Sequence, residues 1–212
     1  MRFVVVAGTG TEIGKTWVTA GLVGALRRRG IAVAVRKPVQ SFSIDHNVKT
    51  DAEILGEAAG ASAHTVCPDH RWLPAAMAPP MAADALGLDL FTIGDLAAEV
   101  STNTNAAEIV LVESAGGVRS PLAADGDTVS LVLALQPALV ILVADAELGT
   151  INLVRLSIDA LTGQRVVVYL NRFNGDDELH SRNRDWLVTR EGLEVFTDPE
   201  ALEHVVATLA AR

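Results

Sequence analysis

A glycine-rich segment near the start of the chain has the composition of a phosphate-binding loop. Residues 8–16 read Gly-Thr-Gly-Thr-Glu-Ile-Gly-Lys-Thr and lie between an apolar run and a helix-like segment. Backbone N–H groups in such a turn bind nucleotide phosphates, Lys15 would add a charge at the β/γ-phosphates, and the Thr16 hydroxyl would reach Mg²⁺. The usual motif has glycine at the position of Thr9, so this loop is a variant. The Gly-Lys-Thr triplet disfavours the alternative, an ordinary glycine-rich turn.

Three further residues have the types that a nucleotide site needs. Glu113 ends an apolar run and is soon followed by two glycines. At the carboxyl edge of a strand it would face the crevice of the loop and bind a metal. The alternative is a solvated acid at a strand end. Asp51 begins a helix, where the helix dipole alone favours an acid. Lys37 ends another strand and would stabilise charge on a moving phosphoryl group, although a surface lysine is an equally good interpretation.

The elements that would position these residues are short β-branched runs alternating with helix-length segments. This order predicts an α/β fold of the P-loop NTPase-like kind, with a mostly parallel sheet and helices on both faces. Strands are expected at Phe3–Ala7, Ala32–Arg36, Ile109–Glu113, Leu139–Ala144 and Val166–Leu170. Helices are expected at Lys15–Arg29, Asp51–Ala59, Ile93–Val100, Thr128–Leu135, Ile151–Leu161, Asn183–Arg190 and Pro199–Ala210. Thr50 and Glu53 predict a capping box on the second helix.

One long stretch does not follow this alternation. Val66–Leu90 contains four prolines and no clear hydrophobic period. It is therefore predicted to be an irregular excursion over the surface, and it is a candidate substrate loop.

Composition limits the classes of partner and the location. The 212 residues suit a single domain over residues 1–212, and half of them are apolar. The net charge of −9 argues against nucleic acid and against an anionic membrane as partners. The longest apolar stretch is too short and too interrupted to span a bilayer, and the single Cys67 excludes an intrachain disulfide. We therefore expect a soluble, cytoplasmic protein.

Taken in order, these segments resemble those of the dethiobiotin synthetases, the ATP-dependent carboxylases that close the ureido ring in biotin synthesis. Residues 8–16 are similar to that family's phosphate loop, including the shifted first glycine. The other matching segments are Lys37-Pro38-Val39 with Ser41, Thr50-Asp51, Glu113-Ser114-Ala115-Gly116-Gly117, Leu148-Gly149-Thr150-Ile151-Asn152 and Asn171. The resemblance covers Met1 to about Phe173 and is loose in the last forty residues.

The resemblance implies a reaction and a set of roles. One amine of 7,8-diaminononanoate would take up CO₂ as a carbamate, ATP would phosphorylate the carbamate, and the second amine would expel phosphate. The implied roles are catalysis by Lys15, Lys37, Glu12 and Ser41; nucleotide binding by Gly10, Thr11, Glu12, Ile13, Gly14, Lys15, Thr16 and Asn171; Mg²⁺ binding by Thr16, Asp51 and Glu113; and substrate binding by Lys37, Ser41, Gly116, Gly117, Thr150, Ile151 and Asn152. Residues 148–152 would lie at the two-fold interface of a homodimer.

Three departures from the family pattern lie near the implied diamine site. Phe42 and Ser114 stand where the family usually has glycine, and Leu153 stands where histidine is common. A related P-loop amidoligase that acts on another amine or carboxylate therefore remains an alternative. A partition-type ATPase is a weaker one, because such proteins carry an early second lysine in the loop, where this chain has Gly10.

Overall fold

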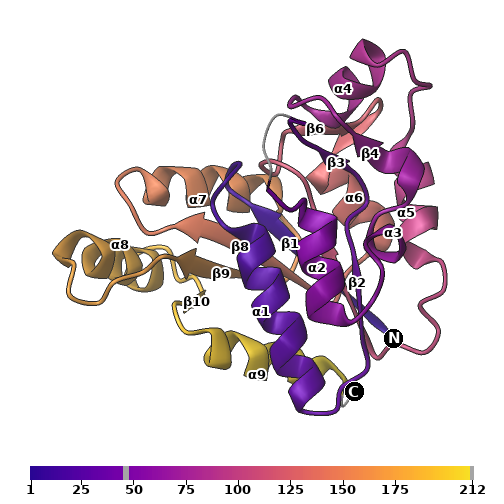
Figure 1. The fold of residues 1–212 in the computed structure, drawn as a ribbon. Helices are drawn as coiled ribbons and strands as arrows, with labels where there is room; N and C mark the ends of the chain where they lie inside the picture. Colours follow the sequence, from indigo (N-terminus) through magenta and orange to yellow (C-terminus); the bar gives the residue numbers. More distant parts are fainter. Residues whose placement is uncertain (45–47, 211–212) are drawn as a thin grey trace.

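The computed structural model describes residues 1–44 and 48–210 and is built on a six-stranded sheet (Figure 1). The strand order is β10–β9–β8–β1–β5–β2, and all neighbouring pairs are parallel. The strands are β1 Arg2–Gly8, β2 Val33–Arg36, β5 Ile109–Glu113, β8 Leu139–Asp145, β9 Val166–Asn171 and β10 Val195–Phe196. This arrangement confirms the predicted α/β fold and five predicted strands. The sixth strand, β10, was missed because its two residues are too short for a hydrophobic pattern.

Helices cover both faces of the sheet, which explains why its strands are apolar throughout. Along β1, Val4 and Val6 pack into one buried cluster, whereas Val5 and Ala7 pack into the other. One face carries α1 Lys15–Arg28, α2 Asp51–Ala59, α3 Ala63–Val66 and α9 Pro199–Ala210. The other carries α4 Pro79–Ala85, α5 Ile93–Ser101, α6 Thr128–Leu135, α7 Thr150–Ala160 and α8 Glu178–Thr189. Alternate residues of a strand point to opposite faces, so each strand contributes side chains to both buried clusters.

One predicted helix begins earlier in the structure than expected, and one predicted helix cap is confirmed. The helix expected at Asn183–Arg190 begins five residues earlier, at Glu178, and Asp177 caps it by accepting from the N–H groups of Leu179 and His180. Its first turns are polar, so hydrophobic spacing did not mark them. The predicted capping box at α2 is confirmed, because the Thr50 hydroxyl accepts from the Glu53 N–H and the Glu53 carboxylate accepts from the Thr50 N–H.

The segment Val66–Leu90 is more regular than expected. It contains a 3₁₀ turn, η1 Asp69–Arg71, the strand β4 Trp72–Leu73 and helix α4. β4 pairs in parallel with β3 Gln40–Ser41, and a second small sheet joins β6 Pro121–Ala123 to β7 Gly126–Asp127. The prolines at the start of α4 are compatible with a helix because the first helical N–H groups have no intrahelical partner. The segment therefore forms a structured rim above the sheet.

The register of the central strands fixes where the loops after them meet. Arg36 lies opposite Val112, and Glu113 lies opposite Val6. Lys37, Glu113 and the loop after Gly8 therefore leave the sheet side by side at its carboxyl edge, where open α/β sheets bind ligands. Over residues 1–44 and 48–210, no helix has the length and apolar character needed to cross a membrane.

Candidate active site

The loop between β1 and α1 is shaped to receive an anion. Gly14 precedes α1 with a left-handed φ of 89°, and no side chain caps the helix. The N–H groups of the first turn are therefore available to a ligand. A Cβ on Gly8 would lie 2.8 Å from Ile13 Cδ1, and one on Gly14 would lie 2.1 Å from Asn171 Nδ2. A side chain at either position would therefore displace Ile13 or Asn171, and the left-handed φ of Gly14 also favours glycine there.

Lys15 is a buried cation held by its own loop. Its Nζ donates to the carbonyl of Gly10 at 2.8 Å, and the residue is only 7% exposed. Burial, followed by the nearby positive charge of Lys37, lowers the pKa of Lys15 to about 8. A phosphate placed on the loop would supply the negative charge that the neutral carbonyl of Gly10 does not.

A second lysine joins two carboxylates beneath the loop. Lys37 Nζ lies 2.8 Å from Glu113 Oε1 and 2.7 Å from Asp51 Oδ2. The Lys37 and Glu113 side chains are 2% and 0% exposed, whereas that of Asp51 is 42% exposed. Burial alone would lower the pKa of Lys37, but the charges of Glu113 and Asp51 outweigh it and raise that pKa. Burial likewise opposes ionisation of Asp51, yet Lys37 and Thr16 hold the pKa of Asp51 below its usual value.

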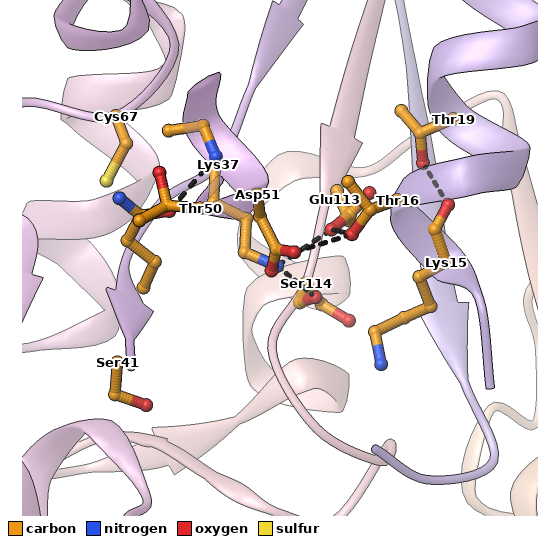
Figure 2. A network of polar contacts seen from close by, with 12 residues as sticks. Lys15, Thr16, Thr19, Lys37, Ser41, Thr50, Asp51, Cys67, Glu113 and Ser114 are labelled. Atoms are coloured by element: carbon orange, nitrogen blue, oxygen red, sulfur yellow. Dashed lines mark hydrogen bonds and ion pairs between the residues drawn. The ribbon is translucent and has the colours of Figure 1, made fainter. Parts of the chain in front are cut away.

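The Thr16 hydroxyl connects the loop to both acids. Thr16 Oγ1 lies 2.8 Å from Asp51 Oδ1 and 2.9 Å from Glu113 Oε1, and its single proton serves one of them at a time. Figure 2 shows these three side chains pointing toward one another, with Lys37 among them. Sequence left open whether Lys37 and Asp51 belong to the site. In the structure, both lie beside the phosphate loop.

The donor set of this network fits a hard divalent cation. A hydroxyl and two carboxylates are oxygen ligands of the kind that Mg²⁺ prefers, and the buried Glu113 Oε2 has no hydrogen-bond partner. In the described part of the chain, no group of three or more His, Cys, Asp or Glu side chains is arranged to hold a metal. A metal at this site would therefore depend on Thr16, on phosphate oxygens and on water for its remaining ligands.

A cavity of about 650 Å³ opens in front of this network. Its lining includes Thr11, Glu12, Gly14, Lys15, Thr16, Lys37, Ser41, Asp51 and Gly116, all of them predicted site residues. Residues 76–79 of the predicted substrate loop complete it. The Ser41 hydroxyl is tied to this rim, because it donates to the carbonyl of Met77 at 2.7 Å. The structure thus brings the implied catalytic residues and the implied metal ligands Thr16 and Asp51 together around one space, and the buried Glu113 lies behind them in contact with Thr16 and Lys37.

None of the three departures lines the space that they were expected to affect. The Phe42 ring packs edge-on against Trp72, with centroids 6.0 Å apart, and is not among the residues that line the cavity. The Leu153 side chain borders a separate cavity of about 670 Å³ together with Gly117. Ser114 is buried, its backbone carbonyl accepts from Lys37 Nζ at 3.3 Å, and its own hydroxyl has no partner.

Several predicted residues do not line the main cavity. Gly10 and Ile13 act through their backbone carbonyls, which accept from Lys15 and from the Asn171 amide at 2.8 Å each. Gly117, Thr150, Ile151 and Asn152 are outside the lining of the 650 Å³ cavity. Their implied substrate contacts remain a prediction.

Trp17 and Arg172 lie beside the loop and were not predicted from sequence. Both line a second cavity of about 450 Å³, together with the predicted residue Asn171 and with Phe173. Arg172 has a left-handed φ of 57°, places Nη1 2.7 Å from Asp145 Oδ2, and donates from Nη2 to the carbonyl of Glu12 at 2.9 Å. Trp17 was detectable as an aromatic residue directly after the Gly-Lys-Thr triplet. Arg172 gave no signal, because its role depends on contacts across the fold.

Comparisons with known proteins agree with this geometry. A family model described as an AAA domain matches residues 2–208. The chain is 35% identical over 199 residues to the ATP-dependent dethiobiotin synthetase of Mycobacteroides abscessus, covering 92% of this chain and 85% of that protein. It is 36% identical over 199 residues to the protein of the same name from Haloferax mediterranei, with coverages of 92% and 82%. A plasmid partition protein from Borrelia burgdorferi superposes with a TM-score of 0.59 at 11% identity, covering 98% and 96% of the chains, and shows a common fold alone.

Proposed function

Because the chain belongs to the dethiobiotin synthetase family, we propose that it carries out the ATP-dependent ring closure that forms dethiobiotin. The observation that carries this proposal is the linked set Thr16, Asp51, Glu113 and Lys37, in which all but the buried Glu113 line a 650 Å³ cavity. These side chains place one ammonium and two carboxylates next to a phosphate loop. Phosphoryl transfer needs positioning and charge stabilisation more than covalent help from the protein, and this set supplies both.

The reaction would proceed by activation of a carbamate. One amine of 7,8-diaminononanoate adds to CO₂ and loses a proton, which gives a carbamate anion. A carbamate oxygen then attacks the γ-phosphorus of ATP and ADP leaves, so that a carbamoyl phosphate forms. The second amine attacks the carbonyl carbon, phosphate departs, and the cyclic urea remains. Each step develops negative charge on oxygen, which positively charged side chains stabilise.

We assign the cationic roles to two lysines. Lys15 would leave the carbonyl of Gly10 and follow the γ-phosphate, because phosphate is the stronger acceptor. Lys37 would neutralise the carbamate from its place between Glu113 and Asp51. Glu12 and Ser41 line the same cavity and would orient the diamine.

Mg²⁺ would be held by Thr16, Asp51 and Glu113. The ion neutralises charge on the β- and γ-phosphates when it is bound. The unpartnered Glu113 Oε2 is an available ligand atom, and the Asp51 side chain is exposed enough to reach a bound nucleotide.

We also propose that residues 1–212 form one domain that acts as a homodimer in the cytoplasm. Leu148 is 85% exposed, and Leu153 and Leu156 are exposed on the first turns of α7. An apolar surface of this kind is stabilised by burial against a partner. Sedimentation of micromolar protein should give a species of twice 22.3 kDa. A monomer alone would contradict the dimer.

One assay tests the reaction. Phosphate release from ATP should rise only when bicarbonate and 7,8-diaminononanoate are both present, and mass spectrometry should identify dethiobiotin. Lys15→Ala provides the control for release by contaminating ATPases. A folded protein that binds ATP and shows no such stimulation would contradict the proposal. It would favour a related amidoligase, a candidate that rests on Ser114 beside Glu113, where the family usually has glycine.

A further inference from the structure

Two consecutive side chains at the end of β9 hold two consecutive carbonyls of the phosphate loop. Asn171 Nδ2 donates to the carbonyl of Ile13 at 2.8 Å, and Arg172 Nη2 donates to the carbonyl of Glu12 at 2.9 Å. Consecutive side chains of an extended strand point to opposite faces, so a regular strand could not direct both of them to one loop. Arg172 has a left-handed φ of 57°, and this turn of the chain brings the two side chains to the same loop.

Asp145 fixes the guanidinium of Arg172 from the neighbouring strand. Strands β8 and β9 pair with Asp145 opposite Asn171, which places the Asp145 carboxylate beside the residue that follows. Arg172 Nη1 lies 2.7 Å from Asp145 Oδ2, while Nη2 of the same rigid, planar group reaches Glu12. The Asp145 Oδ1 atom is buried and has no hydrogen-bond partner in the described part of the chain. Arg172 is therefore the group that compensates the charge of this carboxylate.

The residue held by this pair has an unfavourable backbone conformation. Glu12 has a φ of 56°, in the left-handed region that disfavours residues with a Cβ. Such a conformation persists where surrounding contacts hold it. The hydrogen bond from Arg172 to the Glu12 carbonyl is a contact of this kind, and Glu12 itself lines the 650 Å³ cavity. Without that bond, the peptide between Glu12 and Ile13 would be freer to rotate.

The held carbonyls determine where the N–H groups of the loop point. In a trans peptide, the C=O and N–H groups point in opposite directions. The N–H groups of Ile13 and Gly14 therefore both point away from the side chains that hold the carbonyls. Neither N–H donates to another residue within the described part of the chain. Successive N–H groups turned to one side form a concavity that binds anions.

We propose that Arg172, held by Asp145, is a positioning residue that keeps the phosphate loop in its anion-binding conformation before a ligand arrives. It acts through the Glu12 peptide and does not need to touch the nucleotide. The Arg172 side chain is 58% exposed, and exposed ion pairs contribute little to stability, so the effect falls on binding more than on folding. This inference rests on the proposed function, since it takes the loop to bind nucleotide phosphates.

The test measures phosphate binding with and without the guanidinium. Calorimetry should measure the binding of ATP and of inorganic tripolyphosphate, each with Mg²⁺, to the wild-type protein, Arg172→Ala, Arg172→Gly and Arg155→Ala. Both Arg172 variants should bind either ligand at least about fivefold more weakly, the effect of one lost hydrogen bond. Arg155 is a matched control, because its side chain is 61% exposed and is paired with Glu191, which is 23% exposed. Arg155→Ala should bind both ligands as tightly as the wild-type protein.

Urea denaturation separates positioning from a general loss of structure. Glycine adopts a φ of 57° without strain and alanine does not, so Arg172→Gly should be more stable than Arg172→Ala. Both variants should nevertheless bind tripolyphosphate weakly. Asp145→Ala should also bind it weakly, and adding Asp145→Ala to Arg172→Ala should cause no further loss, because the two side chains act as one unit.

Each failure has a different meaning. Wild-type affinity in both Arg172 variants, or a loss in Arg172→Ala that Arg172→Gly does not share, would overturn the positioning role and leave the proposed function standing. Arg172 also lines the second cavity, so a loss for ATP without a loss for tripolyphosphate would show that it acts on the nucleoside and would overturn the role as well. If the wild-type protein binds neither ligand, the phosphate-loop assignment fails, and this inference fails with it.

Discussion

The two cavities that meet at Gly14 are built in different ways. At the charged cavity of about 650 Å³, Lys37 is almost fully buried and is paired with the buried Glu113 behind it. In the second cavity, which is lined by Trp17 and Phe173, Trp17 is largely exposed. Folding therefore fixes the positions of the charged side chains, whereas it leaves the Trp17 ring largely accessible. Substitution of the ion-paired Lys37 or Glu113 should therefore lower stability and turnover together, whereas substitution of Lys15 should lower turnover without lowering stability.

Lys15→Ala should give the largest loss of activity. Removing the ammonium that stabilises the transferring phosphoryl group should lower kcat at least about 10²-fold. The buried Lys15 ammonium has no carboxylate in hydrogen-bond contact and, as its lowered pKa indicates, destabilises the nucleotide-free fold at neutral pH. The free energy of unfolding at pH 7 should therefore stay the same or rise in this variant. Steady-state kinetics and urea denaturation measure the two quantities. Normal turnover would contradict the phosphate-loop assignment.

The two acids of the charged cavity should differ in their effect on stability. Glu113→Gln removes one partner of a fully buried ion pair and should lower the free energy of unfolding by about 3 kcal/mol. Asp51→Asn acts on a side chain that is 42% exposed and should cost about 1 kcal/mol or less. Both variants should need more Mg²⁺ for half-maximal activity, since an amide is a poorer ligand than a carboxylate.

Asp51→Asn also separates two interpretations of that residue. If its Mg²⁺ titration matches that of the wild-type protein, Asp51 serves only the helix. Equal losses of stability in Asp51→Asn and Glu113→Gln would contradict the difference in burial on which this comparison rests.

The pH dependence of binding tests the state of Lys15. Its pKa of about 8 lies below the value of 10.5 for an unperturbed lysine. The buried ammonium therefore destabilises the nucleotide-free fold below pH 8, and this cost disappears as the pH rises from 8 to 10.5. A bound phosphate would raise the pKa of Lys15 again. Binding of tripolyphosphate near pH 9 should consequently take up a proton, whereas binding at pH 6.5 should take up almost none through Lys15.

Calorimetry in buffers with different ionisation enthalpies measures this uptake. Lys15→Met is the control, since it keeps the length of the side chain without its charge. An uptake at pH 9 that is the same in Lys15→Met and in the wild-type protein would show that another group titrates.

The smallest effect is expected at Phe42. Its ring lies against Trp72 and outside the lining of the charged cavity, so Phe42→Gly should change the KM for ATP less than about twofold. The KM for the diamine should change more, because Phe42 adjoins Ser41 in the chain and helps to place it. Steady-state kinetics with each substrate varied in turn gives both values. A larger change for ATP than for the diamine would contradict this placement.

Sequence predicted the phosphate loop and the central sheet because both depend on local signals. Continuous apolar runs marked five strands, and the Gly-Lys-Thr triplet marked the start of α1. The environment of Lys37 was not predictable, because its burial depends on the pairing of β2 with β5, which lie far apart in the chain. For Asp51, sequence gave two competing explanations, and the structure shows a residue that begins α2 and also contacts Lys37.

The regions that sequence described least well are those made by long-range contacts. The prolines of Val66–Leu90 were interpreted as breaking regular structure, but Pro79 and Pro80 begin α4. The second cavity combines α1 with residues that follow β9 and β10, so no local pattern marked it. Only the folded chain shows that Trp17 lines a cavity, because Phe173 and Pro199 come from distant parts of the sequence to line the same space.

The pairing of Arg36 with Val112 has a consequence for how this protein can diverge in evolution. Side chains alternate between the two faces of a strand, so a shift of β2 by one residue would carry Lys37 away from Glu113. Insertions and deletions within β2 or β5 should therefore be eliminated by selection. The rim formed by residues 66–90 is held by a much shorter register, the two-residue pairing of β3 with β4. Its length can change while the lysine and its acid stay in place, and new substrate preferences should arise there first.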